Sequence, residues 1–440
     1  MSQPSRPAGP SHHPQGPADP IEASADPTAD PTRDPSADLA ATARVAPGGF
    51  PVVGIIGGGQ LARMCQPPAV NLAITLAVLA ESDDASAALV VPHSPVGGHD
   101  DIEAVREFAR HCDVVTFDHE HVPAPVLAAL EADGVSLHPR PTALVFAQDK
   151  LAMRTRLGEL GIPCPRWAQV RTTDELATFG AQTGWPVVLK TPRGGYDGKG
   201  VRVVDEPDEA RDWLAEAAAQ VGTDGPLADG LLAEERVPFT RELAVLVARS
   251  PSGQASAWPV VETVQTDGIC TEVLAPAPGL DPGRATAMIE AGLRIAGELD
   301  VTGVLAVELF EVAGEPGFVV NELAMRPHNS GHWSIDGAVT SQFEQHLRAV
   351  LDLPLGATTA RAPWTVMGNV LGGDRPEDES LYPTYRHLLA RDPGLKVHLY
   401  GKGVRPGRKI GHVNVCGDDL VALRERAAHA TGYLRGTIRE

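Results

Sequence analysis

A glycine-rich basic loop, "KTPRGGYDGKG" at residues 190–200, lies between the apolar runs "VVLK" and "VRVV". A Walker loop joins a strand to a helix and ends in GK[ST], whereas here Lys199 precedes a glycine and a second β-branched run. The pattern therefore predicts a hairpin flap between two strands. Its glycines allow backbone amides to approach phosphate oxygens, and Lys190 and Lys199 supply positive charge. A surface hairpin without function would explain the glycines but not the lysines.

The segment "GVLAVELFEVAGEPGFVVNEL", residues 303–323, predicts a second hairpin. If its turn is centred on Glu315, Glu308 lies directly opposite Glu322, with Cβ atoms about 5 Å apart. Opposed carboxylates repel one another unless a divalent cation lies between them, and magnesium binds one or two carboxylates together with nucleotide phosphates. Asn321 is a further candidate ligand, although its side chain faces the other way in a regular strand. The alternative is a pair of exposed acids without a ligand.

The loop "MRPHNSGHW" follows this hairpin directly. His328 and His332 are four residues apart, a spacing that would suggest zinc on a helix, but the intervening Asn329 and Gly331 disfavour a helix. The loop instead offers a dense set of hydrogen-bond donors for a polar substrate or for charge that develops in a transition state. These donors are Arg326, His328, Asn329 and Ser330.

Two further segments are candidate anion sites. In "GIIGGGQLARM", Gly57, Gly59 and Ala62 match the dinucleotide fingerprint G-x-G-x-x-A, and Glu81 stands where the ribose-binding acid would be. Nothing else in the chain indicates hydride chemistry, so a nicotinamide dehydrogenase is disfavoured, and the helix N-terminus can hold another anion. The second segment, "GKGVRPGRKIGH", supplies the cations Lys402, Arg405, Arg408 and Lys409.

Composition limits the partners. The chain has 440 residues, 43% of them hydrophobic and 21% charged, which is typical of a globular protein with two or three domains. Its net charge of −20 disfavours nucleic acid, and the absence of a long apolar run disfavours a membrane span. The five scattered cysteines favour a reducing, cytoplasmic location. Residues 1–48 carry repeated "ADP" and many prolines, which predicts a disordered tail.

From residue 49 to about residue 148, strands and helices alternate, which predicts a doubly wound parallel sheet in an α/β protein. Further strands flank the flap and form the acid hairpin. The last 80 or so residues mix short strands with a closing helix.

The flap, the strand lysine and the acid pair together resemble the ATP-grasp superfamily. The segments "GIIGGGQLARM", "QDK", "KTPRGGYDGKG", "NELAMRPHNSGHWSIDGAVTSQFEQHLRAVLDLPLG" and "GRKIGHVNV" resemble the 5-(carboxyamino)imidazole ribonucleotide synthase family of purine biosynthesis. This resemblance implies an N-terminal Rossmann-like domain (49–148), an ATP-grasp domain (149–355, with a lid at about 165–232) and a small C-terminal α+β domain (356–440). It also implies a homodimer.

The resemblance implies roles for individual residues. The ATP-binding set is Lys150, Lys190, Gly195, Tyr196, Asp197, Gly198, Lys199, Gly200, Val201, Glu234, Glu235, Arg236, Val237, Glu242, Gln265, Asn321 and Glu322. Glu308 and Glu322 would hold magnesium, or manganese in its place. Tyr196, Asp197, Arg326 and His328 would act in catalysis, and the acceptor would meet Gly58, Gly59, Gln60, Leu61, Glu120, Asn329, Ser330, Lys402, Arg405, Arg408 and Lys409.

Two motifs depart from the family pattern. Gln265 in "VQTDGI" stands where "VHRDGI" is common, and "TFDHEHV" replaces the commoner "TYEFENV" but keeps Glu120. The implied reaction carboxylates the exocyclic amine of 5-aminoimidazole ribonucleotide with ATP and bicarbonate, through carboxyphosphate. Biotin carboxylase and glycinamide ribonucleotide transformylase share the ATP residues, but "GGGQLARM" and "RPHNSGHW" favour the aminoimidazole acceptor. A nucleotide sensor without turnover is disfavoured because both acids are present.

Overall fold

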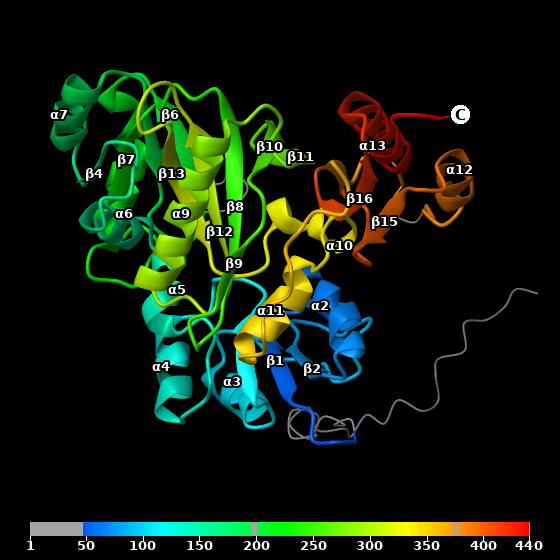
Figure 1. Ribbon diagram of the computed structural model, residues 1–440. Coiled ribbons are helices and arrows are strands. Elements are labelled where there is room, and N and C mark those ends of the chain that lie inside the picture. Colours follow the sequence, from blue (N-terminus) through cyan, green and yellow to red (C-terminus); the bar gives the residue numbers. More distant parts are fainter. Residues whose placement is uncertain (1–46, 196–199, 374, 377–378, 440) are drawn as a thin grey trace, which may run out of the picture.

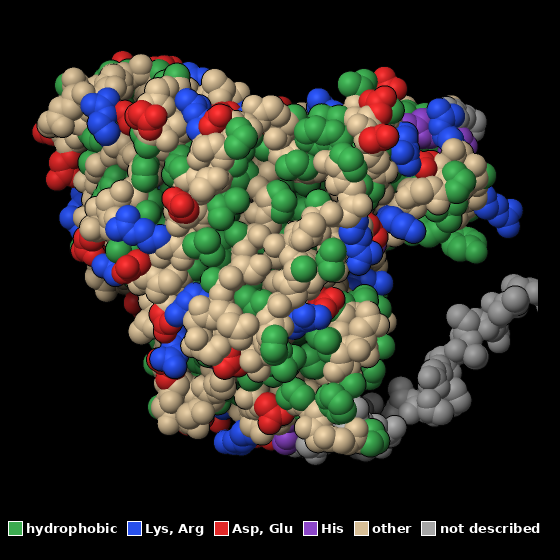
Figure 2. Space-filling view, in the orientation of Figure 1, with side chains coloured by type: hydrophobic (Ala, Val, Ile, Leu, Met, Phe, Trp, Pro, Cys, Tyr) green, Lys and Arg blue, Asp and Glu red, His purple; other side chains and the backbone are tan. Residues whose placement is uncertain are grey.

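The computed structural model describes residues 47–195, 200–373, 375–376 and 379–439. The predicted tail therefore lies outside the described residues up to residue 46. In Figure 1 the N-terminal domain lies at the bottom, the lid at the upper left and the C-terminal segment at the upper right. Figure 2 shows acidic and basic side chains interspersed over this face of the molecule.

The N-terminal domain is built on a parallel sheet in the order β2-β1-β3. The strands are β1 (Val52–Ile56), β2 (Thr75–Leu79) and β3 (Val114–Phe117), and they are almost wholly buried. Its helices are α2 (Gln60–Asn71), α3 (Ile102–Ala109), α4 (Ala124–Ala132) and α5 (Pro141–Gln148). Side chains of α2 pack in one apolar core and those of α3 and α4 in another, as expected for a sheet covered on both faces. The predicted doubly wound parallel sheet is confirmed.

The lid is an antiparallel sheet in the order β4-β7-β5-β6, preceded by α6 (Lys150–Glu159). Its strands are β4 (Trp167–Val170), β5 (Val187–Lys190), β6 (Val201–Val204) and β7 (Leu231–Glu235). One face is covered by α7 (Thr173–Thr183), η1 (Pro207–Ala210) and α8 (Arg211–Gln220), which share a buried core with it. Lys190 pairs with Val201, so the glycine-rich loop closes a β5–β6 hairpin as predicted.

The central sheet has nine strands among the described residues, in the order β13-β12-β8-β10-β11-β14-β16-β15, with β9 on β8. They are β8 (Arg241–Arg249), β9 (Ala255–Ala257), β10 (Val261–Thr266), β11 (Ile269–Ala275), β12 (Gly303–Glu311), β13 (Phe318–Ala324), β14 (Trp364–Leu371), β15 (Lys396–Leu399) and β16 (Lys409–Gly417). The accompanying helices are α9 (Pro282–Glu298), η2 (Asn329–Gly331), α10 (Ser334–Gly337), α11 (Gln342–Val350), α12 (Thr384–Arg391) and α13 (Leu420–Arg435). Because β11 pairs with β14, the C-terminal strands extend the ATP-grasp sheet rather than forming a separate one.

The N-terminal domain and the central sheet are joined by buried contacts. The His346 ring on α11 accepts a hydrogen bond from the Val304 amide on β12 (3.1 Å) and contacts Thr116 Oγ1 on β3 (2.9 Å). Phe343 and Leu347 of the same helix pack in the α2 core. Helix α11 therefore fixes the carboxyl edge of the N-terminal sheet relative to the acid hairpin, which sets the walls of the cavity between them.

Candidate active site

One large cavity, of about 1100 Å³, lies between the three parts of the chain. The N-terminal domain contributes Gln60, Leu61 and the segment after β3, and the lid contributes Arg193, Gly194 and Gly195. The central sheet and the C-terminal strands complete the wall. The structure thus brings together, as lining residues, these predicted site residues: Gln60, Leu61, Glu120, Lys150, Gly195, Glu308, Glu322, Arg326, His328, Asn329 and Lys409.

The acid pair lies on the β12–β13 hairpin. Glu308 pairs directly with Glu322, so the predicted pairing of the two acids is confirmed, although nearer the turn the register is shifted by one residue and Leu309 pairs with Val320. Burial raises the pKa of Glu308 to about 7, and the neighbouring Glu322 and Glu242 carboxylates add to this shift. A carboxylate that resists ionisation beside another acid is a suitable ligand for a divalent cation, because the cation removes the repulsion. Oxygen donors of this kind fit magnesium.

Asn321 also faces the acids, which corrects the expectation that its side chain points away. A β-bulge between Glu308 and Leu309 shifts the pairing by one residue and breaks the regular alternation of side chains. Asn321 Nδ2 donates to Glu308 Oε2 at 3.4 Å, and its Oδ1 accepts from Lys190 Nζ at 3.0 Å. The amide therefore links the acid hairpin to the lid.

Two of the three lysines in the predicted ATP-binding set, Lys150 and Lys190, contact acids. Lys150, at the start of α6, lies 3.0 Å from Glu322 Oε1. Lys190, at the end of β5, lies 2.7 Å from Glu234 Oε2. Lys150 therefore contacts the acid hairpin through Glu322, and Lys190 contacts it through Asn321.

Glu234 has a structural partner that sequence reasoning missed. Arg154 is fully buried, and its Nε lies 2.5 Å from Glu234 Oε1 while its Nη2 donates to the Asn321 carbonyl at 2.7 Å. The Glu234 carboxylate, held by Arg154 and Lys190, is only 2% exposed. Its side chain is thus occupied by these two cations, so a contact of Glu234 with ATP would come from its backbone. The available signal in the sequence was that Arg154 lies four positions after Lys150, and so on the same side of helix α6.

The remaining nucleotide residues are placed as follows. Gln265 hydrogen-bonds the Glu242 carboxylate, whose pKa is raised by burial. Glu235 pairs with Arg166 at 2.7 Å, and Arg236 is exposed after β7. Val237 is half-buried after the end of that strand, and Gly200 precedes Val201 on β6. Tyr196, Asp197, Gly198 and Lys199 lie outside the described residues.

Two loops also line the cavity, one after β3 and one after β13. Arg326 Nε lies 2.8 Å from Glu120 Oε2. His328 Nε2 lies 3.4 Å from Glu308 Oε1, and its Nδ1 contacts Ser330 Oγ at 2.9 Å. Burial lowers the pKa of His328 to about 3, helped by Arg326, so this imidazole is neutral. His328 precedes and His332 follows the short η2, so no α-helix places them on one face and the zinc interpretation of this pair stays disfavoured.

Two carboxylates accept hydrogen bonds from backbone amides at and just after the glycine turn that follows β1. The Gly58 amide donates to Glu81 Oε2 at 3.2 Å, and the Ala62 amide at the start of α2 donates to Asp118 Oδ1 at 2.7 Å. A Cβ on Gly59 would lie 1.9 Å from Asp118 Oδ2, so this position requires glycine. Sequence reasoning missed Asp118, although it lies within the motif "TFDHEHV", of which only Glu120 was considered.

The basic C-terminal segment divides into two pairs. Lys402 Nζ hydrogen-bonds Gln60 Oε1, and Lys409 lines the cavity. Arg405 and Arg408 are exposed and do not line it. Of the four predicted cations, Lys402 is therefore placed to meet an anion at the glycine turn, and Lys409 is placed to meet one in the cavity.

Comparison with known proteins decides the family. Three family models match in order: a ribonucleotide synthetase preATP-grasp domain (51–148), an ATP-grasp domain (155–343) and a phosphoribosylaminoimidazole carboxylase C-terminal domain (365–426). The N5-carboxyaminoimidazole ribonucleotide synthase of Mycobacterium tuberculosis is 54% identical over 386 residues, 87% of this chain and 88% of that protein. That of Corynebacterium ammoniagenes is 48% identical, over 88% of this chain and 92% of its own length.

The chain belongs to the N5-carboxyaminoimidazole ribonucleotide synthase family. Solved structures of this family agree with the fold. The enzyme from Thermus thermophilus is 36% identical with a TM-score of 0.75, covering 88% of this chain and 99% of that one. The Aspergillus clavatus enzyme, solved with ATP, is 33% identical with a TM-score of 0.77, covering 89% and 99%. It was also solved with ADP and 5-aminoimidazole ribonucleotide.

As a member of this family the chain is an ATP-dependent ligase with the ATP-grasp fold, and the fold class predicted from the sequence is confirmed. In the part of the chain that the structure describes, no helix has the length and apolar character needed to cross a membrane.

Proposed function

We propose that the cavity holds ATP, bicarbonate and 5-aminoimidazole ribonucleotide together, and that its residues divide between phosphoryl transfer and carboxyl transfer. The chain carboxylates the exocyclic amine of 5-aminoimidazole ribonucleotide with ATP, in purine biosynthesis. The observation that supports the assignment of roles is that the paired Glu308 and Glu322 line one cavity with Lys150 and with the Arg326–Glu120 pair, and that Asn321 links the acids to Lys190.

In the first step a bicarbonate oxygen attacks the γ-phosphorus of ATP, the bond to the β-phosphate oxygen breaks, and ADP leaves. Lys150 would exchange its Glu322 partner for phosphate oxygens, and Lys190 would add a phosphate oxygen to its contacts with Glu234 and Asn321, so that both spread the charge that develops on the phosphates. When bound, a magnesium ion held by Glu308 and Glu322 would neutralise and align the β- and γ-phosphates. Manganese has the same ligand preference.

In the second step the exocyclic amine attacks the carbonyl carbon of carboxyphosphate. A C–N bond forms, and the bond between the carbonyl carbon and the bridging phosphate oxygen breaks. Phosphate leaves, and the amine loses a proton. The Arg326 guanidinium would bind the carboxyl oxygens, oriented by Glu120. Neutral His328 accepts from the Ser330 amide through Nδ1, so Nε2 carries the hydrogen, and this N–H, now 3.4 Å from Glu308 Oε1, would turn to donate to the same group.

The acceptor phosphate would lie at the glycine turn, where Lys402 contacts Gln60, with Lys409 in the lining of the same cavity. Gly58, Gly59 and Leu61 would shape this end of the site, with Asn329 and Ser330 on the opposite wall. Tyr196 and Asp197 stay candidates for the part of the flap that faces the acceptor. The homodimer also stays a prediction, which light scattering on the purified chain would test.

The test is ADP release measured with ATP alone, with either co-substrate, and with both. Turnover should rise markedly only when bicarbonate and 5-aminoimidazole ribonucleotide are both present. A rate that is the same in all four mixtures would contradict the proposal.

A further inference from the structure

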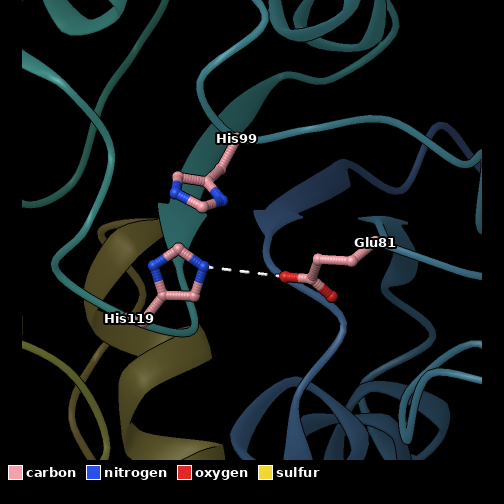
Figure 3. Close-up of side chains that lie close together, drawn as sticks. All are labelled: Glu81, His99 and His119. Atoms are coloured by element: carbon pink, nitrogen blue, oxygen red, sulfur yellow. Dashed lines mark ion pairs between the residues drawn. The ribbon is translucent and has the colours of Figure 1, made fainter.

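Three side chains outside the nucleotide site converge at the carboxyl edge of the N-terminal sheet. Glu81 follows β2, His99 precedes α3, and His119 follows β3. Figure 3 shows both imidazoles and the carboxylate pointing toward one another. One ligand atom from each lies within 4.8 Å of the others, and Glu81 Oε1 is 3.7 Å from His119 Nε2. The two imidazole centroids are 4.7 Å apart with planes at 76°.

We propose that Glu81, His99 and His119 form a binding site for a divalent cation of the zinc type. Two imidazoles and one carboxylate are the donor set of open zinc sites, in which water takes the fourth position. Ligands of tetrahedral zinc lie about 3.4 Å apart, so Glu81 and His119 are near the required spacing and the widest separation in the cluster must contract by at most about 1.4 Å. Glu81 is 48% exposed and all three residues lie in loops, so this contraction needs only side-chain movement and small loop shifts.

The protonation states suit a metal. The hydrogen bond with His119 lowers the pKa of Glu81 to about 2, so the carboxylate is anionic. Burial, with His119 nearby, lowers the pKa of His99, which leaves a lone pair free at neutral pH. Glu81 Oε2 accepts from the Gly58 amide at 3.2 Å, which fixes the orientation of the carboxylate.

Metal binding has one identifiable cost. His119 Nδ1 accepts a hydrogen bond from the His121 amide at 3.2 Å, which keeps the proton of the neutral ring on Nε2. Coordination through Nε2 moves that proton to Nδ1 and gives up this contact. The loss of one neutral hydrogen bond, worth about 1 kcal/mol, is small beside the coordination of zinc by three protein ligands.

The cluster differs in metal preference from the acid pair. Glu308 and Glu322 offer oxygen alone, which suits magnesium, whereas the two imidazole nitrogens favour zinc and its neighbours in the transition series. A cation at the cluster would cross-link the three loops around the glycine turn. The expected consequence is a more rigid acceptor end of the cavity and a higher melting temperature of the loaded chain.

The test is calorimetric titration of the chelator-stripped full chain with zinc, in excess magnesium to fill the acid pair. One equivalent should bind, and His99→Ala or His119→Ala should weaken binding at least tenfold. His111→Ala, in the same domain but outside the cluster, should bind as the unmodified chain does. Cobalt(II) bound in place of zinc should show the strong visible absorption of a low-coordinate site, and His119→Ala should lose it.

His99→Cys controls for the possibility that His99→Ala loses zinc binding through misfolding. A thiolate is also a zinc ligand, so His99→Cys should bind zinc where His99→Ala does not. The proposal is overturned if the unmodified chain binds no zinc under these conditions. It is equally overturned if His99→Ala binds zinc as tightly as the unmodified chain, or if His99→Cys fails to restore it.

Discussion

Lys190 on lid strand β5 donates a 3.0 Å hydrogen bond to Asn321 on β13 of the central sheet. The contact exists because a β-bulge turns Asn321 towards the acid pair, where it also donates to Glu308. The bulge therefore joins the lid, the acid hairpin and a phosphate-binding lysine in one network. Lid and sheet meet at the proposed polyphosphate position through this amide.

Asn321→Ala should lower kcat/KM for ATP by about tenfold or more, because a hydrogen bond to a charged group contributes about 1.5–3 kcal/mol. Steady-state ADP release measures this effect. Asn71→Ala, which removes an exposed amide at the end of α2, is the matched control and should leave the rate unchanged. Equal rates for the two variants would show that the bridge has no role in ATP use.

Substitutions can distinguish the role of Glu308 and Glu322 in turnover from that of another acid on the same hairpin. Glu308→Gln and Glu322→Gln should each reduce turnover about a hundredfold or more, because both carboxylates are proposed to hold the cation that neutralises ATP. Glu315→Gln, at the exposed turn of that hairpin, should behave as the unmodified chain. Near-normal activity of Glu322→Gln would remove Glu322 from the metal site.

Arg154 offers a stability test. Arg154→Ala leaves the Glu234 carboxylate buried with one cation fewer, so unfolding in urea should show a loss of about 3–5 kcal/mol. Arg156→Ala, two residues along the same helix, breaks a partly exposed pair with Glu159 and should cost less than about 1 kcal/mol. Similar losses for both variants would mean that the buried pair does not stabilise the fold.

Glu308 predicts a pH dependence of stability in the metal-free protein. Its pKa is raised in the folded state from 4.5 to about 7, so folding favours the protonated acid. The contribution is full below pH 4.5 and is lost as the pH rises through about 7. Unfolding free energies measured across this range should therefore fall less in Glu308→Gln than in the unmodified chain. Parallel curves for the two proteins would contradict the assignment.

Substitution of Arg326 should uncouple ADP formation from carboxylation of the acceptor. Arg326→Gln removes the proposed clamp on the carboxyl group but leaves both lysines and both acids in place, so ADP should form with little carboxylation. The ratio of carboxylated product to ADP measures this uncoupling. Arg361→Gln, an exposed arginine outside the cavity, should keep the ratio of the unmodified chain. A variant that loses both products in proportion would place Arg326 in ATP binding instead.

Much of this arrangement could be predicted from the sequence. A turn centred on Glu315 predicted that Glu308 faces Glu322, and the two do pair. The strands nearer the turn pair Leu309 with Val320, however, and the bulge after Glu308 is what brings the two acids opposite each other. The lone glycine after Lys199 was enough to distinguish the flap from a Walker loop. Both inferences used residues close together in the chain.

The remainder depended on tertiary contacts. The bulge that turns Asn321 inward leaves no mark in residue types, and the partnership of Arg154 with Glu234 joins positions 80 residues apart. The joining of β14 to β11, which extends one sheet into the C-terminal segment, is likewise a long-range pairing that local patterns do not specify. In the basic segment, neighbours in the sequence are separated in space. Lys402 and Lys409 face Gln60 and the cavity, whereas Arg405 and Arg408 are exposed on the surface.

The most direct test of the central claim follows the carbon of isotopically labelled bicarbonate. With ATP and 5-aminoimidazole ribonucleotide present, label should enter the carboxylated ribonucleotide in a one-to-one ratio with the ADP released, and both products should be lost together in Glu322→Gln. ADP formation that needs 5-aminoimidazole ribonucleotide but transfers no label to it would contradict this account.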